Sequence, residues 1–541
     1  MGATVTRLAG DERDARFLRL IELGIALSAE RNHDRLMEAI LLSAKEMTGA
    51  DGGTLYLRTD DDSLRFAIMR NDTLGIALGG TTGKPIPYPA LPLHGEDYRP
   101  NYHNVATYCA LEGKTVNIAD AYHIERFDFS GTKAFDAKTG YRSKSFLTVP
   151  LKNGRDEVIG VLQLINARDG AGQVIAFGHD IQPLIEALAS QAAVALDNQA
   201  LMQGQKDLLE SFIKVIAHAI DAKSPYTGGH CQRVPELTLL LARAAADAKA
   251  GPFSDFDLSE DEWYELYIAA WLHDCGKVTT PEAVVDKATK LETIYDRIHT
   301  VDTRFEVLKR DAEIEYLKAQ LEGRDPVAAR TSYEERLAHI EDDRAFLRQI
   351  NIGGEFMVPE KIERLKHIAA QRWTDVDGKD APFLTENEVL NLSIARGTLT
   401  DEERKIINDH IVVTIEMLQR LPFPKNLRRV PEYAGGHHEK MDGTGYPYGL
   451  KREQLSLPAR IMAIADIFEA LTAADRPYKS AKTLSESIRI MSFMKKDNHI
   501  DPDLFELFLR SGVYRTYAEK FLKPEQIDAV DIGQYVSLAA E

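Results

Sequence analysis

The sequence predicts a multidomain protein in which an N-terminal α+β domain, with an antiparallel sheet and helices, is followed by a long helix and an all-helical part. Three observations support this prediction. The chain has 541 residues, which is too many for one hydrophobic core. Strand-like runs are confined to residues 51–167. From about residue 205 onward the apolar residues follow helical spacing, and we expect no strand there.

The N-terminal domain is expected to begin with helices and to continue with strands. Residues 14–48 have the spacing of two amphipathic helices, broken at the sequence RNHD. Five strand-like runs follow, separated by Gly, Asp and Asn turns: GTLYLR, LRFAIMR, KTVNIA, SKSFLTVPL and EVIGVLQLINA. The last run is almost continuously apolar, so we expect a central strand that is covered on both faces.

A single long helix is predicted over residues 180–222. Its apolar stripe contains Ile181, Leu184, Ile185, Leu188 and Ala192, and Gly204 is the one glycine inside it. This helix would join the two parts of the chain. Stripes at coiled-coil-like spacing in this helix and in the first helices also predict a homodimer.

Residues 291–396 form a second helical pattern. Apolar residues recur at steps of three and four, are interrupted at EGRDP, and resume: Ile294, Ile298, Val301, Phe305, Leu308, Ala312, then Leu337, Ile340, Leu347 and Ile350. The pattern predicts a charged antiparallel helical hairpin. We interpret it as a structural or dimerising arm; recognition of a partner protein is the alternative.

Composition excludes several classes of protein. The formal charge of −18 argues against a nucleic-acid partner. No run approaches 18 apolar residues, and the N-terminus lacks the apolar core of a signal peptide, so we expect no membrane span. The three cysteines, Cys109, Cys231 and Cys275, have no paired spacing, which fits a reducing compartment. We therefore expect a cytoplasmic protein.

Seven candidate metal ligands are scattered through the helical part: His230, His273, Asp274, His410, His437, His438 and Asp466. Each has an ordinary structural explanation when taken alone. Asp274 and Asp466, however, stand in apolar surroundings, where an ionised carboxylate needs a cation or strong hydrogen bonds. Imidazoles and carboxylates without thiolates suit Fe, Mn, Ni or Zn. Seven ligands exceed the need of one ion, so we expect two divalent ions bridged by a carboxylate, a centre suited to phosphodiester hydrolysis.

Basic residues follow these candidate ligands within a few positions. They are Arg233, Lys277, Lys440, Arg476 and Lys479. Any one of them alone is an ordinary surface charge. Their repeated placement beside candidate ligands indicates an anionic substrate.

Four motifs in order resemble the HD-GYP family, the bacterial phosphodiesterases of cyclic di-GMP within the HD hydrolases. They are YTGGHCQRV, HDCGK, HHEKMDGTGYP and IADIFEALTAADRPYK. The resemblance covers residues 205–515 except the insertion at 291–396. It implies that the seven candidates hold two divalent transition metal ions, with Fe or Mn favoured over Ni or Zn and with Asp274 as the bridge. Tyr226 stands where some relatives have a glutamate for a third ion, so two are expected.

The same resemblance assigns roles around the metals. Lys277 would stabilise charge on the scissile phosphate or help to protonate the leaving oxygen. Tyr446, between Gly445 and Pro447 in a glycine-punctuated loop, would contact the nucleotide. Phosphate contacts are expected from Arg233, Lys440, Arg476 and Lys479. We expect Cys275, inside HDCGK, to be a packing residue, with a redox-sensitive switch as the alternative.

The N-terminal part resembles GAF domains over residues 17–200, on the sequences AKEMTGADGGTLYL and GYRSKSFLTVPLKNGRDEVIGVLQLINARD. Some GAF domains bind cyclic nucleotides through an Asn-Lys, Phe, Asp-Glu signature. The chain keeps Asn166, Phe177 and Asp180, but Ala167 and Ile181 replace the lysine and the glutamate. The resemblance therefore implies a regulatory domain with an unknown small-molecule ligand, or a dimerising one, rather than specific cyclic-nucleotide binding.

The leading hypothesis is a phosphodiesterase regulated by its GAF domain that hydrolyses cyclic di-GMP to the linear dinucleotide, with continuation to GMP left open. Three alternatives stay open: a phosphodiesterase of another cyclic dinucleotide such as cyclic GMP-AMP, a catalytically silent sensor or scaffold, and an HD nucleotidase of mononucleotides or guanosine tetraphosphate. The expected layout is a tail over 1–16, the GAF domain over 17–200, the catalytic domain over 205–515 and a tail over 516–541.

Overall fold

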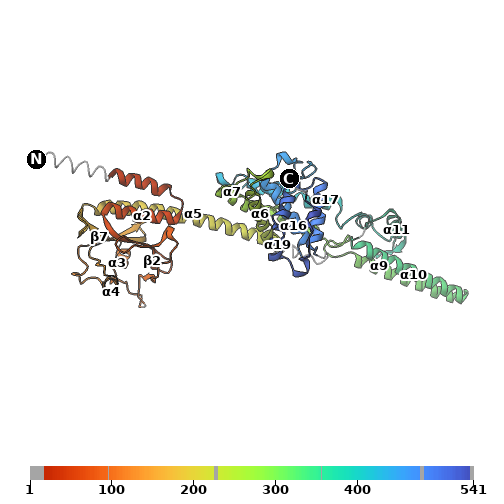
Figure 1. The fold of residues 1–541 in the computed structure, drawn as a ribbon. Helices are drawn as coiled ribbons and strands as arrows, with labels where there is room; N and C mark the ends of the chain where they lie inside the picture. Colours follow the sequence, from red (N-terminus) through yellow and green to blue (C-terminus); the bar gives the residue numbers. More distant parts are fainter. Residues whose placement is uncertain (1–16, 96, 224–228, 355, 475–480, 537–541) are drawn as a thin grey trace. The chain divides into compact units, whose positions relative to one another are not determined.

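The chain divides in sequence into two compact units, residues 1–208 and 209–541 (Figure 1). The computed structural model describes residues 17–95, 97–223, 229–354, 356–474 and 481–536. The tail expected over residues 1–16 lies outside the described residues. Within the described ranges, no helix has both the length and the apolar character that crossing a membrane requires.

An antiparallel sheet forms the centre of the first unit, as predicted. Its spatial order is β3-β2-β1-β7-β6-β5, with β4 beside β2 and β8 beside β7. The strands are β1 (Ala50–Arg58), β2 (Ser63–Asn71), β3 (Ile76–Gly79), β4 (Leu91–Pro92), β5 (Val116–Ile118), β6 (Phe146–Lys152), β7 (Val158–Arg168) and β8 (Val174–Ile175). Leu164 of β7 pairs with both Gly53 and Leu147, so the prediction of a central last strand is confirmed.

Helices cover both faces of this sheet (Figure 1). The break predicted at RNHD separates a helix over residues 17–29 from α2 (His33–Thr48), and Asn32 caps α2 by accepting the N–H of Arg35. Apolar residues of α2 and of the first turns of α5 (Gln182–Lys223) pack on one face of the sheet. The helices α3 (Val105–Glu112) and α4 (Ser130–Thr139) belong to the other side.

The predicted long helix is confirmed. α5 runs for 42 residues without interruption. Ile185, Leu188 and Ala192 of its first half are fully buried in the core of the first unit. Ile213, Ala217 and Ile220 of its second half are buried in the core of the second unit. The one helix therefore contributes to both cores.

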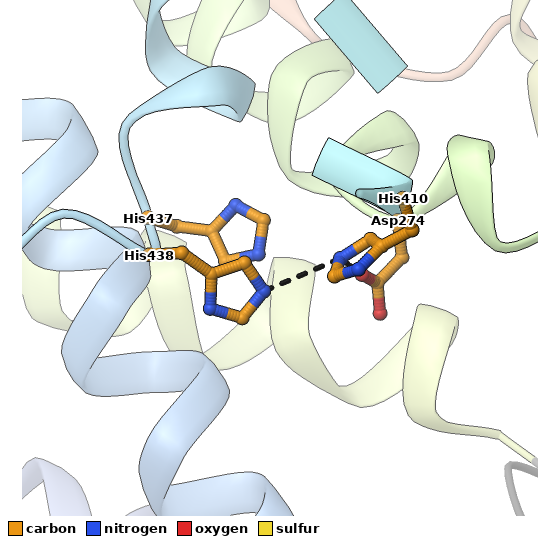
Figure 2. A group of neighbouring side chains, drawn as sticks. All are labelled: Asp274, His410, His437 and His438. Carbon is orange, nitrogen blue, oxygen red and sulfur yellow. Dashed lines mark hydrogen bonds and ion pairs between the residues drawn. The ribbon is translucent and has the colours of Figure 1, made fainter. Parts of the chain in front are cut away.

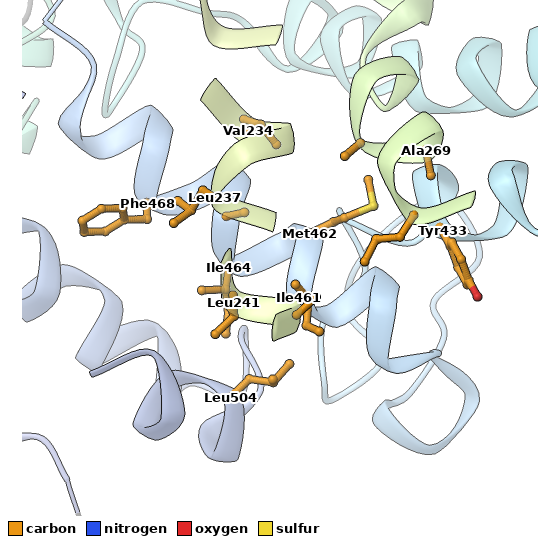
Figure 3. Packing of buried hydrophobic residues seen from close by; sticks show 14 of the residues in the cluster. Val234, Leu237, Leu241, Ala269, Tyr433, Ile461, Met462, Ile464, Phe468 and Leu504 are labelled. Atoms are coloured by element: carbon orange, nitrogen blue, oxygen red, sulfur yellow. The ribbon is translucent and has the colours of Figure 1, made fainter. Parts of the chain in front are cut away.

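The second unit is a helical domain organised around α16 (Leu457–Thr472). Ile461, Ile464 and Phe468 of α16 pack against Val234 and Leu241 of α6 (Figure 3). The other helices are α6 (His230–Ala246), α7 (Glu260–Leu272), η3 (Cys275–Thr279), α8 (Glu282–Val285), α13 (Asp401–Asn408), α14 (His410–Gln419), α15 (Val430–Gly435), α17 (Leu484–Lys496), α18 (Pro502–Arg510) and α19 (Val513–Phe521). Tyr517 and Ala518 of α19 are buried, so residues 516–536, expected as part of a tail, pack on the domain, while residues 537–541 lie outside the described residues.

The insertion contains the predicted hairpin and more. The hairpin is α9 (Ile298–Leu321) and α10 (Pro326–Asn351), and it is followed by α11 (Pro359–Ala370), β9 (Arg372–Thr374), β10 (Asp380–Pro382) and α12 (Glu386–Leu392). The expectation of no strand after residue 205 is wrong, because β9 and β10 pair antiparallel. Their turn is held by Asp375, which accepts the N–H groups of Asp377 and Lys379.

Two glycines provide a paired test of this fold. In Gly204→Ala the new methyl group meets no atom within 4 Å, so α5 should gain about 0.5–1 kcal/mol of helix stability. Hydrogen exchange of the α5 amides should then slow by roughly twofold to fivefold. In Gly160→Ala the methyl group would lie 2.5 Å from the carbonyl oxygen of Tyr56, so the sheet should be destabilised. Faster exchange in Gly204→Ala, or a sheet unaffected by Gly160→Ala, would contradict this description.

Candidate metal centre

The ends of helices bring the candidate ligands together. His230 is the first residue of α6 and His410 the first of α14, while His273 and Asp274 lie between α7 and η3. Asp466 lies within α16. His437 and His438 follow α15 in the sequence GGHHEKMDGTGYPYG, residues 435–449, which we call the GYP loop. Segments far apart in sequence thus converge because the helices that carry them share one core.

The seven residues form two groups that share Asp274. Group A contains His230, His273, Asp274 and Asp466; group B contains Asp274, His410, His437 and His438 (Figure 2). Within each group the ligand atoms lie within 4.8 Å of one another. All seven residues are buried except Asp466 and His438, which are half-buried. The carboxylate of Asp274 therefore belongs to two clusters, and each cluster is small enough to hold one metal ion.

Backbone carbonyls orient three of the imidazoles. The Nδ1–H groups of His273 and His437 donate to the carbonyl oxygens of Ala270 at 2.8 Å and Ala434 at 2.6 Å, three residues earlier in each case. His410 donates in the same way to Ile407. A proton on Nδ1 leaves the lone pair on Nε2, so each ring directs a ligand atom toward the centre.

A carboxylate orients the fourth imidazole. His230 Nδ1 contacts Glu469, a residue that is 1% exposed. Its Nε2 therefore faces the centre, 3.2 Å from Asp274 Oδ2 and 3.3 Å from Asp466 Oδ1. Such carboxylate–histidine pairs are typical supports of metal ligands. Glu469, which is not among the candidates predicted from the sequence, therefore orients a candidate ligand.

The donor set fits divalent cations. Among the described residues, His273 Nε2 and Asp274 Oδ1 are buried without a hydrogen-bond partner. The Nε2 atoms of His410 and His438, both ring atoms aimed at the same space, lie 3.3 Å apart. Buried polar atoms without partners are costly, and a cation between them would satisfy all of them at once. The nitrogen and oxygen donors, without sulfur, suit first-row transition metals.

The charges of the two groups differ. Although burial raises it, the neighbouring Lys277, His273 and His230 hold the pKa of Asp274 well below its usual range. Although burial lowers it, the Asp274 carboxylate helps to raise the pKa of His273 to about 9. In group B, burial and the nearby His273 lower the pKa of His437 to about 4. The carboxylates of group A thus hold positive charge, which is a proton on His273 when no cation is bound, whereas His437 of group B is a neutral imidazole at neutral pH.

The GYP loop is folded by Glu439, which is 1% exposed. Its two carboxylate oxygens accept the N–H groups of Tyr448 at 2.7 Å and Leu450 at 2.9 Å. Gly445 packs so tightly that a methyl group there would overlap the backbone of Glu439 and Lys440. Gly445 thus has a structural role in placing its neighbour. The ring of Tyr446 stacks on His438 with centroids 4.9 Å apart.

The predicted cations are placed unequally. Lys277 Nζ lies 2.5 Å from Asp274 Oδ2, directly beside the shared ligand. Arg233 instead binds Glu469, with Nε and Nη2 each 2.7 Å from Oε1, so the structure gives it a contact with a support of His230. Lys440 and Pro447 belong to the GYP loop. Arg476, Lys479 and Tyr226 lie outside the described residues. Cys275 is 2% exposed and packs in the domain core.

Removing the shared carboxylate should affect both groups. We expect Asp274→Asn to lose both metal ions and His437→Ala to lose chiefly the ion of group B, because only Asp274 belongs to both groups. Metal content per chain after dialysis measures the effect. Asp442→Asn is the matched control, because this exposed carboxylate of the GYP loop accepts from Thr444 instead. Equal metal content in Asp274→Asn and Asp442→Asn would contradict the shared ligand.

Comparison with known proteins agrees with this geometry. A GAF domain model matches residues 32–196, and an HD domain model matches residues 386–504. The HD match begins in α12, at the end of the insertion, so it includes His410, His437, His438 and Asp466 but not the ligands that precede the insertion. The insertion thus divides one metal centre between two stretches of sequence.

Curated relatives carry cyclic dinucleotide phosphodiesterase names. A 3′3′-cGAMP-specific phosphodiesterase 3 of Vibrio cholerae is 40% identical over 299 residues, which is 55% of this chain and 38% of that protein. A 3′3′-cGAMP-specific phosphodiesterase 1 of the same species is 33% identical over 169 residues, 29% of this chain and 38% of that protein. A cyclic di-GMP phosphodiesterase of Pseudomonas aeruginosa is 40% identical over 119 residues, 22% of this chain and 28% of that protein.

The matched part of the chain spans 28–38% of the length of these three relatives. The chain contains an N-terminal GAF domain and a C-terminal HD domain, and it is similar in sequence to proteins named as cyclic dinucleotide phosphodiesterases.

Proposed function

We propose that the chain is a metal-dependent phosphodiesterase that hydrolyses cyclic di-GMP to the linear dinucleotide under the control of its GAF domain. The observation that carries the proposal is the pair of ligand groups joined by Asp274. Two divalent ions in these groups, with Fe or Mn favoured over Ni or Zn, would supply Lewis-acid polarisation of the phosphate and a nucleophilic water at neutral pH. Group A would hold one ion and group B the other.

The residues around the metals would orient the phosphate and stabilise its charge. Lys277 lies against Asp274, and although burial lowers it, the carboxylates of Asp274 and Asp466 raise the pKa of Lys277. Lys277 therefore stays protonated and would neutralise charge on the scissile phosphate or donate a proton to the leaving oxygen. Tyr446, stacked on His438, presents an aromatic ring at the metal centre for a nucleotide base. Arg233 and Lys440, and Arg476 and Lys479 outside the described residues, are proposed for phosphate contacts.

Cyclic GMP-AMP is the second candidate substrate, because the relatives include proteins named for each of the two nucleotides. The complete ligand set favours an enzyme over a silent scaffold. Analysis of the products shows whether the linear dinucleotide is cleaved further to GMP. An HD nucleotidase would instead cleave mononucleotides or guanosine tetraphosphate.

Hydrolysis of cyclic di-GMP and cyclic GMP-AMP by the same Mn- or Fe-loaded preparation tests the proposed activity. Lys277→Met should lower kcat by about 10²–10³ while the metal content stays near that of the wild type, because the lysine stabilises charge without binding the ions. Lys425→Met is the matched control, because this lysine is exposed at the start of a 3-10 helix of the same domain, Lys425–Leu427. Cleavage of mononucleotides or guanosine tetraphosphate alone would overturn the proposal, and cleavage of none of these compounds would favour the scaffold.

A small uncharged molecule is the proposed ligand of the GAF domain. A cavity of about 380 Å³ is lined by residues that include Tyr56, Phe66, Tyr88 and Gln163. The cation in its lining is Arg70, whose guanidinium donates to Glu38 and to three backbone carbonyl oxygens. These contacts use its donors, so Arg70 is not available for a phosphate.

Two of the three residues kept from the cyclic-nucleotide signature have structural contacts in the GAF fold. Asn166 accepts the N–H groups of Lys144 and Ser145 and donates to the carbonyl of Arg142. Phe177 is buried in the core beside α2 and α5. Neither residue lines the cavity. We therefore propose structural roles for these two residues rather than roles in binding a ligand.

A parallel homodimer through α5 is also proposed. Val194, Leu201, Leu208 and Val215 recur at seven-residue steps and are 45%, 52%, 57% and 64% exposed. This is the spacing of a coiled-coil seam.

The hairpin tip, with Leu321 and Val327 exposed by 89% and 74%, is the proposed surface for a protein partner of the arm. The three cysteines are free and buried, which suits the proposed cytoplasmic location.

Sedimentation velocity at micromolar concentration tests the dimer. The wild type should sediment as a dimer, and a double change of Leu201→Asp and Leu208→Asp should yield monomers, because the change places two charges in the apolar seam. Glu210→Gln, on the same helix, serves as the control. A monomeric wild type would contradict the proposed association.

A further inference from the structure

The last turn of α5 contacts both segments that carry the ligands of group A. Ile213, Ala217 and Ile220 fix this end of the helix in the core of the second unit, where each is at most 6% exposed. Two charged residues follow on the same turn. Asp221 contacts the start of α6, and Lys223 contacts the end of η3.

Lys223 holds the backbone that follows Asp274 and Lys277. Its Nζ donates to the carbonyl oxygens of Val278 at 2.5 Å and Thr280 at 2.6 Å, and it lies 3.4 Å from that of Lys277. An ammonium group has three donors, and here all three face backbone carbonyls. These carbonyls lie at the C-terminal end of η3, the end of a helix that favours a cation. η3 begins directly after Asp274, so this contact restricts the position of the shared ligand.

Asp221 holds the backbone around His230. This carboxylate is 6% exposed, and it accepts the N–H groups of Gly229 at 3.2 Å and Cys231 at 3.5 Å. These are the residues on either side of His230, at the N-terminus of α6. A carboxylate at this position satisfies backbone donors that have no partner within the helix. The contact thereby restricts where the His230 ring enters group A.

We propose that Asp221 and Lys223 are positioning residues of the metal centre, which together set the separation between His230 and Asp274 in group A. The inference rests on the proposed metal-dependent function. Both side chains lie two residues apart on one rigid turn, so they act on the two ligand segments from a common base. Asp221 acts on His230, which belongs to group A alone, so a change of Asp221 should affect group A more than group B, whereas Lys223 acts on the segment of the shared Asp274.

The same contacts provide a route for regulation. α5 begins at Gln182, and its first half is part of the core of the GAF unit. Between its halves the helix has no proline, so a rotation or an axial shift of α5 would be carried to its last turn. A displacement there would act through Asp221 and Lys223 on the backbone beside His230 and on the backbone after Asp274. Sub-ångström errors in the position of catalytic groups are costly, so a small shift would change the rate without breaking the fold.

Variants of the two residues test the inference in the full-length protein. Lys223→Met and Asp221→Asn should each weaken the binding of one Mn²⁺ ion per chain by about tenfold or more, the size expected when a residue that supports a metal ligand is lost. Lys223→Arg, which keeps the charge and the donors, should retain most of the affinity. Lys214→Met is the matched control, because this exposed lysine of the same helix interacts with Glu210 at 3.5 Å and with Tyr267, not with the segments that carry His230 and Asp274.

The kinetic readout distinguishes positioning from catalysis. At limiting Mn²⁺, kcat of Lys223→Met and Asp221→Asn should fall about tenfold, with a much smaller change in KM, and excess Mn²⁺ should restore it. Excess metal should not restore Lys277→Met. Mn²⁺ affinity in Lys223→Met and Asp221→Asn equal to that of Lys214→Met would overturn the inference.

Hydrogen exchange of the wild type gives a second test that needs no variant. Mn²⁺ loading should slow amide exchange in the last turns of α5 and in residues 277–280, because metal binding tightens the segments that these contacts join. Exchange in α10, in the insertion, should not change. Unchanged exchange at the end of α5 would also overturn the inference.

The proposed function and the positioning roles can fail separately. If the wild type binds two ions but cleaves no cyclic dinucleotide, the proposed function fails, while Mn²⁺ affinity and amide exchange still test the positioning roles.

Discussion

The sharing of the Asp274 carboxylate between two ligand groups is the constraint on which the rest of the second unit depends. A carboxylate that is 2% exposed and surrounded by imidazoles needs positive charge or strong hydrogen bonds around it to stay ionised. Lys277 provides one permanent positive charge at 2.5 Å, and the two groups provide space for two more cations. The helices α6, α7, α14 and α16 must therefore pack so that their ligand-bearing positions meet at one point.

Local structure explains why the ligands lie at helix ends. A histidine at the first or last turn can donate Nδ1–H to a backbone carbonyl and leave Nε2 free, as His273 and His437 do. The close approach of η3 and α14 also requires a glycine: a methyl group on Gly276 would overlap the backbone of His410 and Thr414. The close packing of η3 against α14 at Gly276 therefore also determines how near His410 lies to Asp274.

Much of the fold and of the site could be predicted from the sequence, for physical reasons that differ between them. The long strands and α5 were predictable because each runs for several periods of its apolar pattern. β9 and β10 were not, because strands of three residues contain too few residues to show a period and are fixed by a turn at Asp375. The convergence of the candidate ligands was predictable because their motifs are unusual in combination. Glu469 was not, because its role depends on a contact with His230, 239 residues away.

The same distinction applies to the basic residues. Lys277 stands beside Asp274 in both sequence and space, whereas Arg233 is bound to Glu469, which sequence proximity to His230 does not reveal. X-ray absorption spectroscopy of the Mn- or Fe-loaded protein measures the central claim most directly. We expect nitrogen and oxygen ligands and a second metal at about 3.5–4 Å, the separation of two ions that share a carboxylate and a water. A spectrum with a single isolated ion, or with sulfur ligands, would contradict a centre bridged by Asp274.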